Sequence, residues 1–294
     1  MKKILLAALL CAPFIGFAQR HHEIGLVGGI ASYNGDLQQK TVPNQKFTKP
    51  AIGIMYKYFF NPHVGIRASA NYMQLTGADS LSSNTTQKLR NLSFGNDIYE
   101  LYAGIEYNFV AFGSENFKVT PYIFGGVGAF YGDPYAEDKY GVKIHLRDLG
   151  TEGQGLPMYP NRDKYSLVNA SFPFGGGVKF MIGKSVILGA EFNLRYTSTD
   201  YIDDVSQSYV NMDSLFMYKG AKAVEMSYRG VENPDWDGNY PNYKFQRGDY
   251  KGNDWYWTLG LTATIRLNSK PNKPLYYQSR CPRIFGIGLG RNKE

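Results

Sequence analysis

The chain has 294 residues, a formal net charge of +7 and 15% aromatic residues, with 24 Tyr and 33 Gly. The charge excess lies at the two ends, because Lys2, Lys3 and the basic segment 268–294 account for all of it and leave the body near neutral. A nucleic-acid-binding protein would carry that charge on its folded body, so we exclude this class. Tyr and Gly suit strands and turns better than helices, which indicates an all-β protein.

The first residues, MKKILLAALLCAPFIGFAQ, have the pattern of a secretory signal peptide. Two lysines precede an apolar stretch that ends in small residues, so cleavage is expected after Ala18. Cys11 follows Leu10 rather than a small residue, which argues against a lipidated cysteine. No later apolar run is long enough for a transmembrane helix. We expect residues 1–18 to be removed, which leaves Cys281 alone and permits no internal disulfide.

Eight segments in which apolar and polar residues alternate follow one another along the chain, and each predicts a β-strand with one apolar face. They are 22–34, 50–60, 63–76, 95–112, 116–132, 166–183, 185–201 and 254–267. In the stretch WYWTLGLTATIRL (255–267), every second residue is apolar. Most of the segments exceed the ~9–11 residues that a tilted strand needs to cross a bilayer. The body of the chain, residues 19–267, is therefore expected to form one domain.

The connections between these strands alternate in length without exception. Tight turns are expected at 60–63, 112–115 and 182–185, whereas long connections span 35–49, 77–94, 133–165 and 202–253. An up-and-down barrel of the outer membrane has short periplasmic turns and long extracellular loops, whereas a soluble sandwich has no reason to sort its loops. The sequence thus predicts an all-β, eight-stranded antiparallel transmembrane β-barrel in outer-membrane lipid, with both termini in the periplasm.

Charged residues occupy strand positions that alternate with the apolar ones and therefore face the barrel interior. The predicted inward set is Glu23, Lys57, Arg67, Glu100, Glu106, Lys179, Glu191, Arg195 and Arg266. In a soluble core each unpaired charge would carry a large desolvation cost. Inside a membrane barrel the acids and bases can pair, and side chains fill the interior of an eight-stranded barrel. We expect lumen ion pairs that act as a plug, and no open pore.

Aromatic residues gather toward both ends of the predicted strands, as in the girdles of membrane barrels. Near the long loops they are Tyr196, Tyr201, Trp255, Tyr256 and Trp257, and by the short turns they are Phe59, Phe60, Phe109 and Phe112. The alternative is that aromatics simply favour strands. This alternative explains any single residue as well, but it explains the clustering less well.

Few residues carry a pattern typical of catalysis or metal binding. Asp200, Asp203 and Asp204 could bind Ca²⁺, but Asp is also an ordinary turn residue where a strand passes into a loop. Of the four histidines, only His145 lies in a long outer loop, and it has no rigid nucleophile beside it. The tripeptide RGD (247–249) is too short a motif to predict adhesion. We expect no enzyme, and no catalytic, metal, cofactor or small-molecule site.

Five stretches of the sequence resemble the PorG-type family of outer-membrane barrels of Bacteroidota. They are EIGLVGGIASYNGDL (23–37), FPFGGGVKF (172–180), LRYTSTDYIDDVS (194–206), RGDYKGNDWYW (247–257) and CPR (281–283). The resemblance implies a non-enzymatic subunit of the type IX protein secretion machinery, associated with a periplasmic ring of PorK-like and PorN-like subunits. The segment 207–246 matches no pattern of that family.

Two further classes of function are considered beside this one. A stand-alone barrel would tether the envelope or present its long loops to surfaces or ligands. A porin-like channel is disfavoured by the charged lumen.

A basic tail, residues 268–294, follows the last predicted strand into the periplasm. The short turns are too small to supply about 800 Å² of contact per partner, so the tail is the candidate for ring binding. Steering of a partner is predicted for Lys270, Lys273, Arg280 and Arg283, and burial against it for Tyr276, Tyr277, Ile284 and Phe285. The alternative is a disordered end that contacts lipid headgroups or the cell wall.

Overall fold

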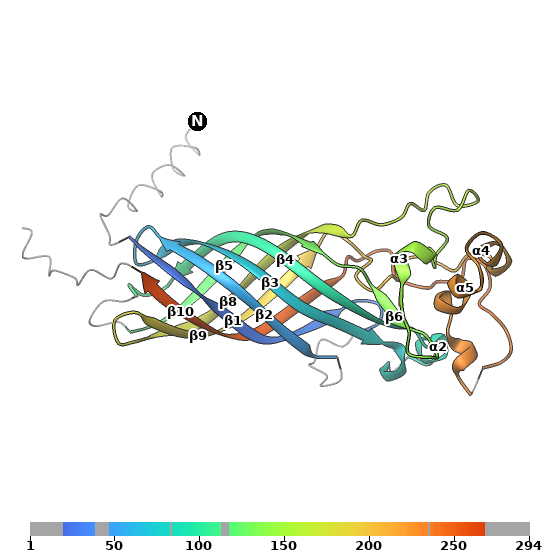
Figure 1. Cartoon of the computed structure of the whole chain (residues 1–294), viewed down its shortest axis with the longest axis horizontal. Helices are drawn as coiled ribbons and strands as arrows, with labels where there is room; N and C mark the ends of the chain where they lie inside the picture. Colours follow the sequence, from blue (N-terminus) through green and yellow to red (C-terminus); the bar gives the residue numbers. More distant parts are fainter. Residues whose placement is uncertain (1–19, 39–46, 83, 113–117, 235, 268–294) are drawn as a thin grey trace, which may run out of the picture.

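Figure 1 shows the computed structural model of the chain, a long β-barrel with loops and short helices gathered at one end. The structure describes residues 20–38, 47–82, 84–112, 118–234 and 236–267. The predicted signal peptide, 1–18, and the predicted tail, 268–294, lie outside these described residues. Within the described ranges, none of the helices combines the length and the apolar character needed to cross a membrane.

Eight long strands form the barrel, and each pairs antiparallel with both of its neighbours. They are β1 (His21–Asn34), β2 (Lys49–Phe59), β3 (Val64–Ala78), β4 (Ser93–Asn108), β5 (Val119–Tyr131), β8 (Val168–Ile182), β9 (Val186–Thr197) and β10 (Trp255–Leu267). Their order is β3, β2, β1, β10, β9, β8, β5, β4, and pairing of β3 with β4 closes the ring. The predicted eight-stranded antiparallel barrel is confirmed. β4 and β9 end earlier than predicted, at Asn108 and Thr197.

The alternation of residue types determines which face of each strand turns outward. Along β10, Leu259, Leu261 and Ile265 are exposed, whereas Thr262 and Thr264 between them are buried. Exposed Ile, Leu, Val or Phe side chains recur on all eight barrel strands. A wall that is apolar on every side is unfavourable in water and is the surface that a bilayer covers.

Short and long connections lie at opposite ends of the barrel, here called the short-turn end and the loop end. Residues 60–63 join β2 to β3, and 183–185 join β8 to β9, where Gly183 adopts a φ of +64°. The β4–β5 connection runs from 109 to 118 and is longer than the predicted turn at 112–115, of which 113–115 lie outside the described residues. Because the strands are antiparallel, the described parts of the four long connections meet at the loop end, and most of the cap in Figure 1 comes from the β3–β4, β5–β8 and β9–β10 connections.

The long connections contain regular elements where the sequence predicts only loops. They are η2 (Asp79–Leu81), α2 (Thr85–Arg90), β6 (Tyr135–Glu137), β7 (Lys143–His145), α3 (Leu146–Leu149), α4 (Met212–Lys219), α5 (Ala221–Ser227) and η3 (Gly230–Glu232). Asn84 and Asn211 cap α2 and α4, because their side-chain oxygens accept backbone N–H groups of the first turn. β6 pairs with β4 at Gly95 and Tyr135, which continues the barrel wall into the cap.

Only some of the aromatic residues predicted for the two girdles reach the outer wall. Tyr196, Phe60 and Phe109 are exposed, Trp255 and Tyr201 are half-buried, and Phe59, Phe112, Tyr256 and Trp257 are buried. The girdle prediction used position along the strand and ignored which face a residue occupies. For Phe59 and Tyr256 the alternation turns the ring into the lumen, so these two residues pack inside the barrel.

Candidate functional site

The lumen at the short-turn end holds charged side chains that converge on Glu106 of β4. The Nζ atoms of Lys57 and Lys179 lie 2.8 and 2.5 Å from the two Glu106 carboxylate oxygens. The guanidinium of Arg67 lies 3.3 Å from the same carboxylate. All four side chains are at most 2% exposed. Three cations from three different strands thus share one carboxylate.

Arg67 extends this network to a second acid, Glu191 of β9. Its Nη2 donates to both Glu191 carboxylate oxygens, at 3.1 and 3.2 Å, and the Tyr122 hydroxyl donates to Glu191 Oε2 at 2.8 Å. The guanidinium also lies 3.9 Å from the ring centroid of Phe124. A planar, delocalised cation suits a site that combines two carboxylates with an aromatic face.

Two more acids continue the network toward either end of the lumen. At the short-turn end, Glu23 Oε1 lies 2.9 Å from His21 Nε2 and 3.7 Å from Arg266 Nη2. Toward the loop end, Glu100 accepts a hydrogen bond from Arg195 Nε at 2.8 Å. The structure therefore places all nine predicted inward residues in the lumen and gives each of them at least one ion pair.

Large side chains such as Arg67, Tyr122 and Lys179 are almost fully buried in the lumen at the level of these ion pairs. A cavity bordered by Ser69, Asn71 and Tyr102 measures about 20 Å³, which is room for about one water molecule. Each buried ion loses several kcal/mol of solvation, and partners with good geometry are needed to offset that loss. The arrangement can hold the strands together and obstruct passage through the barrel.

An apolar cluster occupies the lumen at the loop end, beyond the ion pairs. Its members are Ala31, Tyr33, Leu37, Met73, Leu75, Leu92, Phe94, Ile98, Phe130, Ile202, Val205 and Tyr256. Ile202 and Val205 come from the connection that follows β9, whereas most of the other members lie on the barrel strands. We call residues 199–206 the mouth segment, because its Ile202 and Val205 side chains pack into this cluster at the loop-end opening of the barrel.

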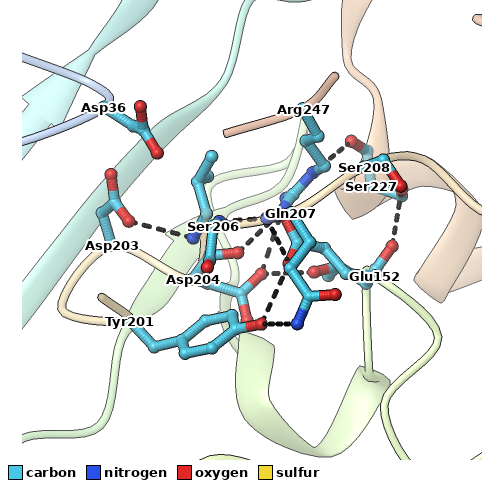
Figure 2. Close-up of polar contacts among 12 residues, drawn as sticks. Asp36, Glu152, Tyr201, Asp203, Asp204, Ser206, Gln207, Ser208, Ser227 and Arg247 are labelled. Carbon is cyan, nitrogen blue, oxygen red and sulfur yellow. Dashed lines mark hydrogen bonds and ion pairs between the residues drawn. The ribbon is translucent and has the colours of Figure 1, made fainter. Parts of the chain in front are cut away.

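A buried ion pair organises the cap above the mouth segment. Figure 2 shows Arg247 among Glu152, Asp204 and Ser227. Arg247 Nη1 donates to Glu152 Oε1 at 3.0 Å and to the Asp204 carbonyl oxygen at 2.6 Å. Its Nε donates to the Ser227 carbonyl oxygen at 3.1 Å. One arginine therefore joins the β5–β8 connection to three separate parts of the β9–β10 connection.

Glu152 also accepts hydrogen bonds from the mouth segment and from the residue that follows it. Its Oε1 accepts the backbone N–H groups of Ser206 and Gln207 at 3.0 and 3.1 Å, and its Oε2 accepts the Tyr201 hydroxyl at 3.3 Å. Glu152 and Arg247 are both buried. A fully paired carboxylate that also accepts backbone donors fixes the path of the segment that it contacts.

Burial raises the pKa values of several carboxyl groups around the mouth segment. It raises the pKa of Asp204 to about 6, although Arg247 and the Tyr165 hydroxyl act in the opposite direction. Burial likewise raises the pKa of Asp36 to about 6 and that of Asp200 to about 7, and neighbouring carboxylates contribute in the same direction. The carboxyl groups around the mouth segment therefore bind protons more tightly than exposed carboxyl groups do.

The structure also places the residues considered for metal binding and adhesion. Asp203 and Asp204 are buried and accept hydrogen bonds from Tyr33, Thr151 and Tyr165. Across the described ranges, no group of three or more His, Cys, Asp and Glu side chains has a metal-binding arrangement. The arginine of the RGD tripeptide is buried in the cap, so that motif is not presented as a free surface loop.

Sequence reasoning missed the pair formed by Glu152 and Arg247, which come from long connections without periodicity. It placed His145 in an outer loop, and the structure pairs His145 Nδ1 with Asp133 Oδ2 at 2.8 Å on the exposed β6–β7 hairpin. The predicted partner-binding residues, Lys270 to Phe285, lie outside the described residues.

Comparison with known proteins identifies one family and several solved barrels. The profile of the family described as "Domain of unknown function (DUF6089)" matches residues 2–224. No curated protein matches the sequence. Neisserial surface protein A is similar at 10% identity and a TM-score of 0.40, over 83% of this chain and 96% of that one.

Two other solved barrels are similar in the same way. For Ail of Yersinia pestis the identity is 12% and the TM-score 0.36, over 84% of this chain and 97% of that one. For OprG of Pseudomonas aeruginosa the identity is 9% and the TM-score 0.38, over 84% and 98%. Similarities this low say nothing about what this chain does.

Proposed function

We propose that this chain, which belongs to the DUF6089 family, is an outer-membrane barrel with a structural rather than a conducting role. The observation that carries this proposal is the filled lumen. Three cations meet on Glu106 at the short-turn end, and Ile202 and Val205 cover the opening at the loop end. An open channel needs a continuous aqueous path, which these two layers of side chains oppose.

We further propose that the barrel is a subunit of the type IX secretion machinery. The support is the resemblance to PorG-type barrels. Two of the resembling stretches, 194–206 and 247–257, contain the mouth segment and Arg247, so they coincide with the residues that build the outer mouth rather than with the lipid-facing wall alone. The cap and mouth are thus proposed as features shared with that family.

In this proposal the short-turn end faces the periplasm and the tail meets PorK-like and PorN-like ring subunits there. The barrel ends in short turns on that side, so the tail supplies most of the contact. Its basic residues would steer the partner, and its aromatic residues would be buried against it.

Truncation of the otherwise complete chain after Asn268 tests the secretion role. Normal insertion, seen as an unchanged heat-dependent gel shift, together with loss of ring co-purification and of type IX secretion, is the expected result. The double substitution Tyr276→Ala and Tyr277→Ala should weaken co-purification, whereas Tyr140→Ala in the exposed β6–β7 hairpin is the matched control. Wild-type secretion and co-purification by the truncated protein would contradict the docking role.

A second candidate function, binding to surfaces or ligands through the cap, is favoured by α4. Phe216, Met217 and Tyr218 are exposed on this helix, Met217 to 78%, and only Leu215 is buried. Exposed apolar side chains that adjoin one another are typical of interaction sites. If Met217→Ser abolishes attachment of expressing cells to a surface while secretion stays normal, this second role is preferred.

A further inference from the structure

The mouth segment is attached to the barrel rim by a hydroxyl group between two carboxyl groups. The Tyr33 Oη atom on β1 lies 2.6 Å from Asp203 Oδ2 and 2.8 Å from Asp254 Oδ1. All three side chains are buried. Asp203 belongs to the mouth segment, and Asp254 immediately precedes β10. One barrel residue thus joins the segment to the start of the last strand.

Two short contacts to one phenol require a second proton. A phenol carries a single proton, so Tyr33 can donate fully to only one of the two carboxyl groups. The other oxygen–oxygen contact is favourable when that carboxyl is protonated and donates to the phenol oxygen.

The second oxygen atom of each carboxyl group, the one that does not contact Tyr33, already accepts a hydrogen bond. Asp203 Oδ1 accepts the Val205 N–H and Asp254 Oδ2 accepts the Ile202 N–H, both at 2.9 Å. The free position for this second proton is therefore the contact between Tyr33 and either Asp203 or Asp254, and we call it the shared proton.

Neighbouring acids make full ionisation of this pair still less favourable. Asp36, in the connection after β1, acts on Asp203, and Asp200 of the mouth segment acts on Asp254. Burial and these carboxylates raise the pKa values of Asp203 and Asp254 well above the ordinary range.

The basic residues nearby are already paired with other acids. Arg90 of α2 acts on Asp203, but its Nε and Nη2 both donate to the carboxylate of Asp79 at 2.7 Å. Arg247 is bound to Glu152. Neither Arg90 nor Arg247 therefore takes the place of the shared proton.

We propose that Tyr33, Asp203 and Asp254 form a proton-dependent latch that holds the mouth segment in the outer opening of the barrel. With the shared proton in place, both carboxyl groups bind the phenol, and Ile202 and Val205 stay in the apolar cluster. When that proton is lost, two adjacent buried carboxylates repel each other, and the segment moves to water, where both are hydrated.

The direction of the pH effect follows from the proton count. The attached state binds one proton that the released state gives up, so the attachment constant falls up to tenfold per pH unit for that proton. The fall begins above about pH 4, the ordinary value for a carboxyl group, and continues to the raised value of the buried pair. The latch is therefore strongest in mild acid and weakest in alkali.

Amide hydrogen exchange of the full chain in detergent micelles tests the latch. Ile202 and Val205 report on it directly, because their N–H groups donate to Asp254 and Asp203. After correction for the intrinsic rate, their protection should fall as the pH rises from about 5 to about 9. In Asp203→Asn the side-chain amide supplies the missing donor. The pH dependence of the protection should therefore lose the contribution of one proton, which is a factor of up to about ten per pH unit.

A control variant and two further variants of the latch complete the test. Asp213→Asn, on an exposed residue of α4, should leave the wild-type slope unchanged. Tyr33→Phe keeps the ring but removes the hydroxyl, and protection of Ile202 and Val205 should fall about tenfold or more in mild acid. If Asp203→Asn does not insert, Asp254→Asn is measured in the same way. A flat wild-type profile, an unchanged slope in either Asn variant or full protection in Tyr33→Phe would overturn the latch.

Discussion

The two halves of the barrel interior are closed by different forces. At the short-turn end, basic side chains such as Lys57 and Arg67 form buried ion pairs with carboxylates inside the lumen. At the loop end, apolar side chains close the opening, and the carboxyl groups around them outnumber the basic groups. The first half depends on carboxylates that are ionised, and the second is held best when some of its carboxyl groups keep a proton.

This difference follows from which elements carry the groups. The paired charges of the lumen lie on barrel strands. These strands cannot separate without breaking a closed ladder of hydrogen bonds. Asp203 and Asp204 lie on the mouth segment, which belongs to the β9–β10 connection and not to that ladder. In the latch proposed above, the groups that exchange protons are therefore on a segment that can move without breaking the barrel.

The largest expected effect comes from Glu106→Gln, which disrupts the ion pairs at the short-turn end of the lumen. Three buried cations would lose their common partner, and loss of one member of a buried pair typically costs ~3–5 kcal/mol. The midpoint of the heat-dependent gel shift should fall markedly. Glu137→Gln, on the exposed end of β6, is the control and should behave as wild type. An unchanged midpoint for Glu106→Gln would mean that the ion pairs contribute little to the closure.

Arg247→Ala should break the cap and spare the barrel. It leaves the Glu152 carboxylate buried without its cation, at a cost of about 3 kcal/mol or more that falls on the cap. Limited proteolysis should then cut within 202–253, while the heat-dependent gel shift of the barrel is retained. Lys251→Ala, on an exposed neighbour, should remain resistant. Equal loss of the barrel transition would show that cap and barrel unfold as one unit.

A change of pH should separate the two halves without any substitution. Burial raises the folded-state pKa of Asp36 and Asp204 to about 6 and that of Asp200 to about 7. A raised pKa means that the closed state binds protons that the open state releases. The closed state is thus favoured fully below about pH 4, and this contribution is lost as the pH rises through 6 and 7. Protease cleavage of the cap should be faster at pH 8 than at pH 5, with an unchanged barrel.

The smallest effect is expected from Ile202→Val, which removes one methyl group from the apolar cluster. Such a change costs about 1 kcal/mol in a well-packed core. Hydrogen exchange of the mouth segment should speed up several-fold at every pH, with the same pH slope as wild type. A changed slope would show that packing and proton binding are coupled at this site.

Much of the barrel could be predicted because strands repeat a pattern of two residues. The alternation in 255–267 and its neighbours gives the eight strands and the inward set that includes Glu106 and Arg67. It also gives the inward face of Phe59, which the girdle prediction overlooked. The face of a residue on a strand is a local property, so the sequence carries it directly.

The cap could not be predicted in this way, because its contacts join distant residues without a period. Arg247 meets Glu152 across 95 residues, and Tyr33 meets Asp254 across 221. Only short-range features left a trace in the sequence, such as the Asn211 cap of α4 and the turn at Gly141 in the β6–β7 hairpin. The chemistry around the mouth segment therefore became visible only with the fold.

The position of Arg247 and Asp254 just ahead of β10 has a consequence for the order of folding. Both residues complete contacts with parts of the chain made much earlier, and β10 is also the strand that pairs with β1 to close the ring. Asp254 directly precedes Trp255, which pairs with Asn34, so Asp254 comes next to Tyr33 only when β1 and β10 pair. We therefore expect the cap to be the last unit to acquire protease resistance during refolding into micelles, after barrel closure, so that newly inserted molecules pass through a stage in which the loop-end opening is uncovered.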